Sequence, residues 1–256
     1  MDGCYDQPTI VPKLCNAKQT ISNCIPTFNL ENMVASIPND IFQFSTWTAV
    51  HEGFSIGQPR AADLTSHGTD GIGVFENGDL MILLDSQAYA VSTAGHATPA
   101  NSNDRVCFVM VTVFQPLRLI KLAQEDTMSF AGLRELLAST DALPTVGGMN
   151  SMLPFKVKGT FTNVTLVQKD SSQNRQVEKV KGTLYGYKIP AWMEGISGPG
   201  LHCHLMGVEG DEDGSTVGGR VESFEAVADP DIGVGKCGRF HLGFPQGEDW
   251  ESVTLS

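Results

Sequence analysis

The sequence predicts an α+β fold that is mainly β-sheet. Two observations carry this prediction: short strand-like runs broken by turn residues follow one another along most of the chain, and only residues 128–139 carry a clear helical stripe. The 27 glycines and 13 prolines among 256 residues agree with many turns and short strands. This length allows one large domain or two closely packed small ones.

The first half combines strands with the single clear helix. Residues 41–54 are expected to form a strand end that leads into a short helix, and residues 65–91 hold three short apolar runs. Between two of these runs, Asn77-Gly78 is a hairpin signal. Residues 105–114 are a continuous β-branched run that is typical of a buried strand. Residues 128–139 place Phe130, Leu133, Leu136 and Leu137 on one helical face.

The second half is almost entirely strand-like. Residues 155–169 and 177–190 alternate in polarity around a turn at 171–175, which predicts a long hairpin. Residues 200–210 and 218–228 form a further pair around an acidic loop, and residues 237–244 are expected to close this set of strands.

Residues 1–40 are predicted to form an N-terminal arm that contains three of the six cysteines, Cys4, Cys15 and Cys24. No C-x2-C pair is present, so disulfides explain this cluster better than a metal site does. Asn163 begins a glycosylation sequon. Both features need the secretory route, so we expect a secreted protein if the chain is a mature form without its signal peptide, and a cytoplasmic protein otherwise.

The charge of the chain narrows its partners. Seventeen basic and 29 acidic side chains leave a formal charge of −12, which would repel nucleic acid and anionic membranes. No apolar run reaches the length of about 18 residues that a membrane span requires. Nucleotide-binding and nucleophile-elbow motifs are absent from suitable contexts in the sequence. A small molecule is therefore the expected partner.

The segment "GLHCHLMG" (200–207) carries the clearest chemical signal. On a strand, His202 and His204 point to one face and Cys203 to the other. Two converging imidazoles can bind a metal ion if a further histidine or carboxylate joins them. They can equally make ordinary hydrogen bonds inside a pocket, and the pattern alone leaves both interpretations open.

Six motifs are more informative as an ordered set: "FQFSTWTAVHEGF" (42–54), "HGTDGIGVFENGDLMILLDSQAY" (67–89), "GTF" (159–161), "GTLYGYKIPAW" (182–192), "GPGLHCHLMG" (198–207) and "GGRV" (218–221). This layout resembles that of the α-acetolactate decarboxylases from about residue 41 to 245. The resemblance implies two packed subdomains of mixed or antiparallel sheet with few helices, commonly dimeric, and a zinc ion in the cleft between them. We place the first subdomain, a sheet and a helix, at 41–150. The second, at 151–256, is rich in β-structure and carries the H-x-H strand.

The chain departs from this family at the metal site. The family follows its H-x-H pair with a histidine in G-G-H, and His202 and His204 match the pair, but Arg220 stands at the third position. An arginine stays protonated in proteins and has no lone pair to donate. These three positions therefore cannot form a three-histidine zinc site.

Other charged groups of the family also differ. The glutamate of a Gly-Glu hairpin is replaced by Asp79, which is one methylene shorter. Leu166 and Val167 stand where the family has an arginine that contacts the substrate carboxylate, so a bidentate clamp is replaced by an apolar wall. A further carboxylate near the C-terminus could be met by Glu248 or Glu251.

These departures predict a repurposed, metal-independent enzyme of specialised metabolism. Its cleft would fold an apolar small molecule and catalyse a cyclisation such as a hetero-Diels-Alder cycloaddition, using a few positioned hydrogen-bond donors. No cofactor is expected. The groups assigned to catalysis are His202, His204, Arg220 and Asp79, and those assigned to substrate binding are Thr46, Trp47, Phe75, Val167 and Trp192.

Two alternatives stay open. The first is a zinc-dependent α-acetolactate decarboxylase that forms acetoin, with zinc held by His202, His204 and compensating carboxylates, since zinc accepts such ligands. The second is a non-catalytic protein that keeps the cleft as a ligand cavity. Each reading allows a homodimer.

Overall fold

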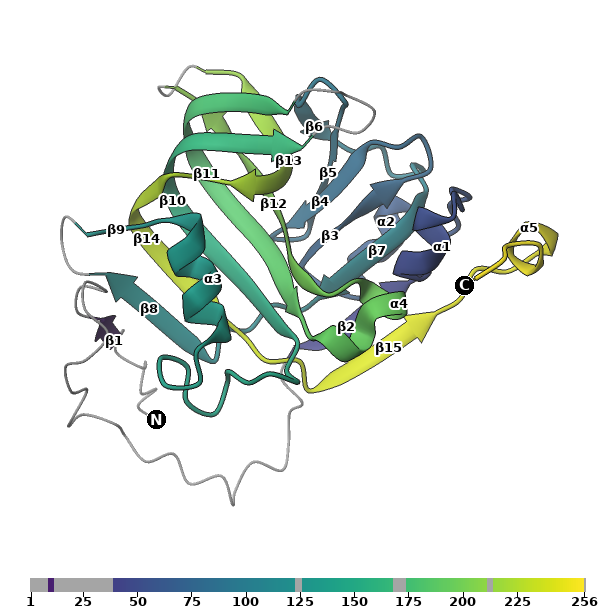
Figure 1. Ribbon diagram of the computed structural model, residues 1–256. Coiled ribbons are helices and arrows are strands. Elements are labelled where there is room, and N and C mark those ends of the chain that lie inside the picture. Colours follow the sequence, from purple (N-terminus) through teal and green to yellow (C-terminus); the bar gives the residue numbers. More distant parts are fainter. Residues whose placement is uncertain (1–8, 12–38, 123–125, 168–173, 211–213, 256) are drawn as a thin grey trace, which may run out of the picture.

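Two β-sheets face each other and enclose an apolar layer (Figure 1). The computed structural model describes residues 9–11, 39–122, 126–167, 174–210 and 214–255. Within this part of the chain, no helix is long and apolar enough to cross a membrane. The mainly β fold class predicted from the sequence is confirmed.

The seven-stranded sheet is built around β7, whose seven residues are all buried. Its two faces contact different layers: one packs against the other sheet, and the opposite face packs against α2. The Asn77-Gly78 turn joins β3 and β4 as an antiparallel hairpin, as predicted. In sheet order the strands are β15 (Arg239–Gly243), β2 (Asp40–Phe44), β7 (Val106–Thr112), β3 (Asp70–Phe75), β4 (Leu80–Leu84), β5 (Gln87–Val91) and β6 (Ala97–Pro99).

The eight-stranded sheet is dominated by the long β10–β11 hairpin, which confirms the hairpin predicted from residues 155–190. β10 pairs with β14 along its first part and with β13 at its end, so β10, β11, β12 and β13 close on themselves. The strands are β1 (Thr9–Val11), β8 (Arg118–Leu122), β9 (Thr127–Met128), β10 (Leu153–Val167), β11 (Arg175–Ile189), β12 (Gly200–Glu209), β13 (Thr216–Ser223) and β14 (Ala226–Val234).

Short helices and one 3-10 turn complete the described structure. The predicted helix at 128–139 is confirmed as α3, which buries Leu133, Leu136 and Leu137 against the eight-stranded sheet, while Ser129 caps its first turn. The helices are α1 (Trp47–His51), α2 (Ala61–Leu64), α3 (Phe130–Ala138), the 3-10 turn η2 (Ala191–Met193), α4 (Glu194–Ser197) and α5 (Glu248–Glu251).

Each of the two sheets contains strands from both sides of residue 150, where we placed the subdomain boundary. β8 and β9 precede this point but belong to the eight-stranded sheet. Residues 237–244 were expected to close the second set of strands; instead β15 pairs in parallel with β2 at the edge of the seven-stranded sheet. Figure 1 shows this yellow strand beside β2. Pairing between segments about 200 residues apart leaves no local signal in the sequence.

The features that suggested secretion are placed only in part. Cys4, Cys15 and Cys24 lie outside the described residues, so the disulfides of the arm stay a prediction. Asn163 is exposed on β10 with a positive φ of 48°, and its amide donates a hydrogen bond to the Glu225 carboxylate. Its glycosylation also stays a prediction.

Candidate active site

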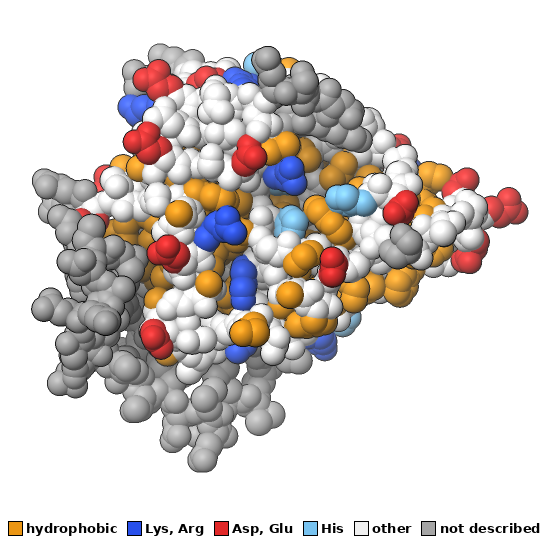
Figure 2. Space-filling view, viewed as in Figure 1, with side chains coloured by type: hydrophobic (Ala, Val, Ile, Leu, Met, Phe, Trp, Pro, Cys, Tyr) orange, Lys and Arg blue, Asp and Glu red, His pale blue; other side chains and the backbone are white. Residues whose placement is uncertain are grey.

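A cavity of about 430 Å³ opens between the two sheets. Its walls are mostly apolar, and its polar groups come from α1, α4, β12 and β13. Figure 2 shows pale-blue histidines among orange side chains near the middle of this face, with blue basic side chains beside them. The lining residues are Trp47, Val50, His51, Ile72, Gly73, Val74, Gly78, Leu80, Phe108, Met110, Val167, Ser197, His202, His204 and Arg220.

Strand register brings four polar side chains into one row. Lys156 on β10 lies opposite Tyr185 on β11, Tyr185 lies opposite His204 on β12, and His204 lies opposite Arg220 on β13. Directly opposed residues in antiparallel strands share a face, so the row points toward the seven-stranded sheet. Cys203 points the other way and is fully buried in the layer behind, as the alternation predicted.

His204 is buried and neutral. Its Nδ1 lies 3.2 Å from the carbonyl oxygen of Met81, and since a carbonyl only accepts, Nδ1 carries the hydrogen and Nε2 keeps a lone pair. Burial, reinforced by the charge of Arg220, lowers the pKa of His204 to about 4. At neutral pH this ring is therefore a hydrogen-bond acceptor with no positive charge.

His202 is held at the mouth of the cavity by the turn that precedes β12. Its Nε2 lies 3.0 Å from the Gly198 carbonyl oxygen, and its ring lies 4.8 Å from the Trp47 ring. Burial lowers the pKa of His202, and the backbone carbonyls of Gly198 and Pro199 only partly offset this effect. The fold therefore presents both histidines of the H-x-H motif in their neutral form.

Trp47 begins α1 and forms an aromatic wall. Thr46 caps this helix by accepting a hydrogen bond from the Ala49 amide at 3.2 Å. The Trp47 ring lies 4.3 Å from His51 and 6.2 Å from Phe108, which is edge-on to it. Gly198 lies close against the indole. A Cβ at this position would come within 2.6 Å of the ring, so only glycine fits here without a shift.

Arg220 is the cation of the cavity. Its side chain is exposed and makes no hydrogen bond or ion pair with any residue in the described ranges. Val167 lies opposite it on β10, at the position where the resemblance implied a missing arginine. The guanidinium is therefore available to an anionic or carbonyl oxygen of a ligand.

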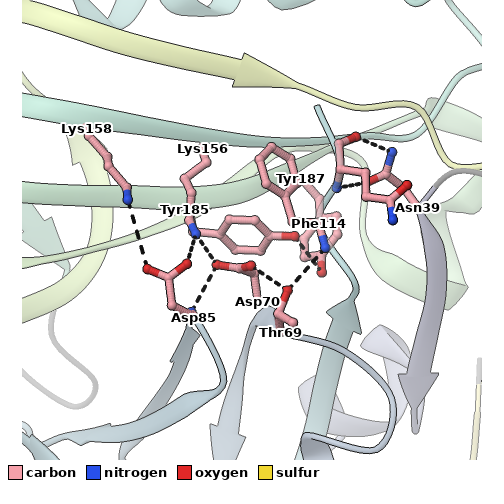
Figure 3. Close-up of polar contacts among 10 residues, drawn as sticks. Asn39, Thr69, Asp70, Asp85, Phe114, Lys156, Lys158, Tyr185 and Tyr187 are labelled. Carbon is pink, nitrogen blue, oxygen red and sulfur yellow. Dashed lines mark hydrogen bonds and ion pairs between the residues drawn. The ribbon is translucent and has the colours of Figure 1, made fainter. Parts of the chain in front are cut away.

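At the opposite end of the row, Lys156 forms ion pairs with two carboxylates (Figure 3). Lys156 Nζ lies 2.5 Å from Asp70 and 2.8 Å from Asp85, and Thr69 donates to Asp70 at 2.8 Å. Burial lowers the pKa of Lys156, but these two carboxylates outweigh it and the pKa is raised overall. Its hydrogen bond to Lys156 lowers the pKa of Asp85. This cluster joins the two sheets.

Four predicted site residues do not line the cavity. Phe75 is buried on the opposite face of its sheet, because Ile72 and Val74 take the cavity-facing positions. Asp79 accepts a hydrogen bond from the Asn77 amide at 3.0 Å within the hairpin turn. Trp192 is 62% exposed, and Thr46 serves as the helix cap. Trp47, Val167, His202, His204 and Arg220 do line the cavity, and their roles in turnover stay predictions.

Sequence reasoning missed two polar residues of the wall. His51 lies one helical turn after Trp47, and this spacing could have placed both on one face of α1. Ser197 lies on α4 and donates to Gln43 at 2.6 Å, while Gln43 also donates to the Ile196 carbonyl. These bonds tie α4 to the seven-stranded sheet and leave Ser197 with a structural partner.

The donor set does not fit the zinc site that the resemblance implies. His202 and His204 offer neutral imidazoles, but the third position holds a guanidinium. Within the described ranges no three histidine, cysteine or carboxylate side chains are grouped to bind a metal ion. Glu248 and Glu251, the C-terminal candidates, are exposed on α5, which projects away from the sheets in Figure 1.

Comparison with known proteins gives one consistent family. A family model described as alpha-acetolactate decarboxylase matches residues 41–256. The alpha-acetolactate decarboxylase of Methanosarcina mazei is 30% identical over 221 residues, which cover 78% of this chain and 74% of that protein. The alpha-acetolactate decarboxylase of Bacillus subtilis is 26% identical over 239 residues, covering 85% and 86% of the two chains.

Solved structures agree on the fold. The crystal structure of the Bacillus subtilis alpha-acetolactate decarboxylase superposes with a TM-score of 0.72 at 23% identity, covering 85% of this chain and 94% of that one. A Staphylococcus aureus protein of unknown function, described as similar to alpha-acetolactate decarboxylase, gives a TM-score of 0.67 at 20% identity, covering 84% and 97%. These likenesses concern the architecture of two packed sheets.

Proposed function

The chain belongs to the alpha-acetolactate decarboxylase family, and we propose that its cavity is the active site of a decarboxylase-type lyase in which Arg220 takes over the electrostatic role of a metal centre. One observation carries the proposal: an unpaired guanidinium and a neutral imidazole with a free lone pair line the same apolar cavity. The relatives' names point to 2-hydroxy-3-oxo acids as the substrate class.

The reaction needs little more than desolvation and one well-placed cation. The bond between the carboxylate carbon and the hydroxyl-bearing carbon breaks, and carbon dioxide leaves. The electron pair moves through the adjacent carbonyl to its oxygen, and after carbon dioxide has left, the resulting enediolate takes up a proton from solvent water to give a hydroxyketone. Charge thus shifts from a carboxylate to a neighbouring oxygen, and a fixed cation aimed at this oxygen lowers the barrier.

The lining residues provide both the desolvation of the carboxylate and the cation at the reacting oxygen. Ile72, Phe108 and Met110 form a wall that withholds water from the carboxylate and so favours its loss. The Arg220 guanidinium donates to the oxygen on which negative charge develops. His204 Nε2 accepts a hydrogen bond from the substrate hydroxyl and orients it.

A cyclisation on a larger apolar substrate, such as a hetero-Diels-Alder addition, is the second candidate. The observation in its favour is the wall itself: beyond Arg220 and the polar side chains already named, the lining formed by the described residues is apolar and includes no carboxylate. Such a cavity can fold a flexible chain, and Arg220 could polarise its carbonyl. A cavity that binds such a molecule without converting it is the third outcome to test.

The deciding experiment measures carbon dioxide release. Purified full-length chain, dialysed against a chelator, is supplied with α-acetolactate and with 2-hydroxy-3-oxo acids that carry longer alkyl groups. We expect release above the uncatalysed rate, with a preference for the longer acids because the cavity is largely apolar. Chelation should leave the rate unchanged, whereas loss of activity that zinc restores would overturn the role given to Arg220.

A conservative variant separates the remaining outcomes. R220K keeps the charge but loses the planar fork, so we expect partial activity, well above that of R220A. If wild-type chain releases no carbon dioxide from any of these acids, the decarboxylase proposal fails. The longer acids would then be tested for binding alone, which would favour the cyclase or the ligand-binding protein.

A further inference from the structure

A second cavity, of about 240 Å³, lies next to the first, between α3, β12 and β13. Arg134 of α3, Arg220 and Glu222 are its charged groups, and Phe130 and Leu201 contribute apolar walls. Arg220 and Val167 line both cavities. The two spaces therefore meet at the guanidinium to which the proposed function assigns the reacting oxygen.

The second cavity exists because two strands separate at this point. β12 and β13 are paired only as far as His204 and Arg220. Beyond this pair β12 continues along β11, where His202 lies opposite Tyr187, whereas β13 turns to pair with β10. Separated strands leave an opening in the sheet, and Arg220 lies at its edge.

The second cavity has two positively charged side chains and one negatively charged side chain, and this excess of positive charge favours an anion. Neither Arg134 nor Arg220 makes a hydrogen bond or ion pair with any described residue. The Glu222 carboxylate accepts a hydrogen bond from the Asn174 amide and is thereby turned to another partner. Two unpaired guanidinium groups on one cavity stand out in a chain with a net charge of −12.

We propose that Arg134 and the second cavity form a subsite for a distal carboxylate of the substrate, which extends from the main cavity past Arg220. The substrate class is then an amphipathic acid with an apolar body and a second carboxylate at its far end. We assign a carboxylate because Arg220 is already given to the reacting oxygen, which leaves the single planar fork of Arg134 to bind the two oxygens of a carboxylate. The inference rests on the proposed function only in placing the reacting end in the main cavity.

The test is direct binding, without turnover. Isothermal titration of the full chain compares monocarboxylates with α,ω-dicarboxylates of equal length, such as octanoate with suberate, across a series of chain lengths. At the best length we expect the dicarboxylate to bind about fivefold more tightly, as for one added charge-assisted hydrogen bond. R134A should abolish this preference, and R134K should keep most of it.

Lys121→Ala is the matched control, because it removes an exposed positive charge from β8 and lines neither cavity. It should leave the preference intact. Equal binding of mono- and dicarboxylates at every length, or an unchanged preference in R134A, would overturn the subsite. Displacement of suberate by millimolar inorganic phosphate would overturn its assignment to a carboxylate. Because no chemistry is measured, a chain that releases no carbon dioxide could still pass this test.

Discussion

Both ends of the row that runs from Lys156 through Tyr185 and His204 to Arg220 are positively charged, but the two cations differ in burial and in partners. At one end Lys156 is mostly buried and contacts two carboxylates that come from the facing sheet. At the other end Arg220 is exposed and has no partner among the described side chains. Between them lie a buried tyrosine and a neutral histidine.

The difference separates a cation used for stability from one available for chemistry. A buried charge must be compensated within the fold, so Lys156 is committed to Asp70 and Asp85. An exposed arginine can remain uncompensated because water solvates it until a ligand arrives. The row thus predicts which substitutions will damage folding and which will damage binding or turnover.

Removing the buried cation should have the largest effect. Lys156→Met leaves the Asp70 carboxylate buried without its ion-pair partner, and we expect the free energy of unfolding to fall by about 3 to 5 kcal/mol. Urea denaturation measures this change. Lys158→Met is the control, since Lys158 is 51% exposed and 3.9 Å from Asp85, and its loss should cost little. Equal stabilities of the two variants would contradict the assignment of Lys156.

Removing the exposed cation should leave folding intact and reduce chemistry. For Arg220→Met we expect carbon dioxide release to fall by about 100-fold, as for the loss of one oxyanion-stabilising donor. The free energy of unfolding should stay within about 0.5 kcal/mol of wild type. A variant that loses stability instead of activity would show that the two ends of the row do not differ as described.

The middle of the row should make stability depend on pH. Because the folded pKa of His204 lies near 4, below its usual 6.5, the unfolded chain binds more protons between these values. The contribution of the neutral His204 to the free energy of unfolding is present above pH 6.5 and is lost as pH falls toward 4. Between pH 6.5 and about pH 5, this one group should lower the free energy of unfolding by about 1.5 kcal/mol.

His204→Asn tests this assignment, since the asparagine amide can still donate to the Met81 carbonyl while its titration is removed. Unfolding followed by urea at several pH values should show a shallower pH dependence in this variant. His96→Asn, at an exposed position, should keep the wild-type slope. The same slope in both variants would mean that His204 is not held neutral by burial.

The smallest effect is expected at the glycine behind Trp47. Gly198→Ala places a Cβ against the indole in a backbone of positive φ, whereas Gly200→Ala also has a positive φ but meets nothing within 4 Å. We expect Gly198→Ala to be about 1 kcal/mol less stable than Gly200→Ala. It should also shift tryptophan fluorescence as Trp47 moves. Equal stability and fluorescence in the two variants would mean that the indole is not tightly packed.

Local patterns predicted much of the fold. The turn at Asn77-Gly78, the stripe of α3 and the alternation of the β10–β11 hairpin depend on neighbouring residues, so the sequence shows them directly. The common face of His202 and His204 followed from the same alternation. The parallel pairing of β15 with β2, by contrast, depends on residues far apart in the chain.

The candidate site was predicted less completely, for specific reasons. His202, His204 and Arg220 could be found because one motif order links them, and strand register then places His204 beside Arg220. Phe75 was assigned to the cavity, although it lies three residues after Ile72 and the alternation of a strand therefore places it on the other face. Arg134 could not be found, because its place beside Arg220 depends on how α3 packs against the separated strands.

The pairing of β15 with β2 also sets an order of events during synthesis. The β10–β12 meander can form as soon as its neighbouring segments have emerged, but β2 must wait for a strand made about 200 residues later. Until then the hydrogen-bonding edge of β2 is open, and an open edge can pair with another chain. A nascent chain is therefore exposed to misassembly at β2 until β15 has left the ribosome.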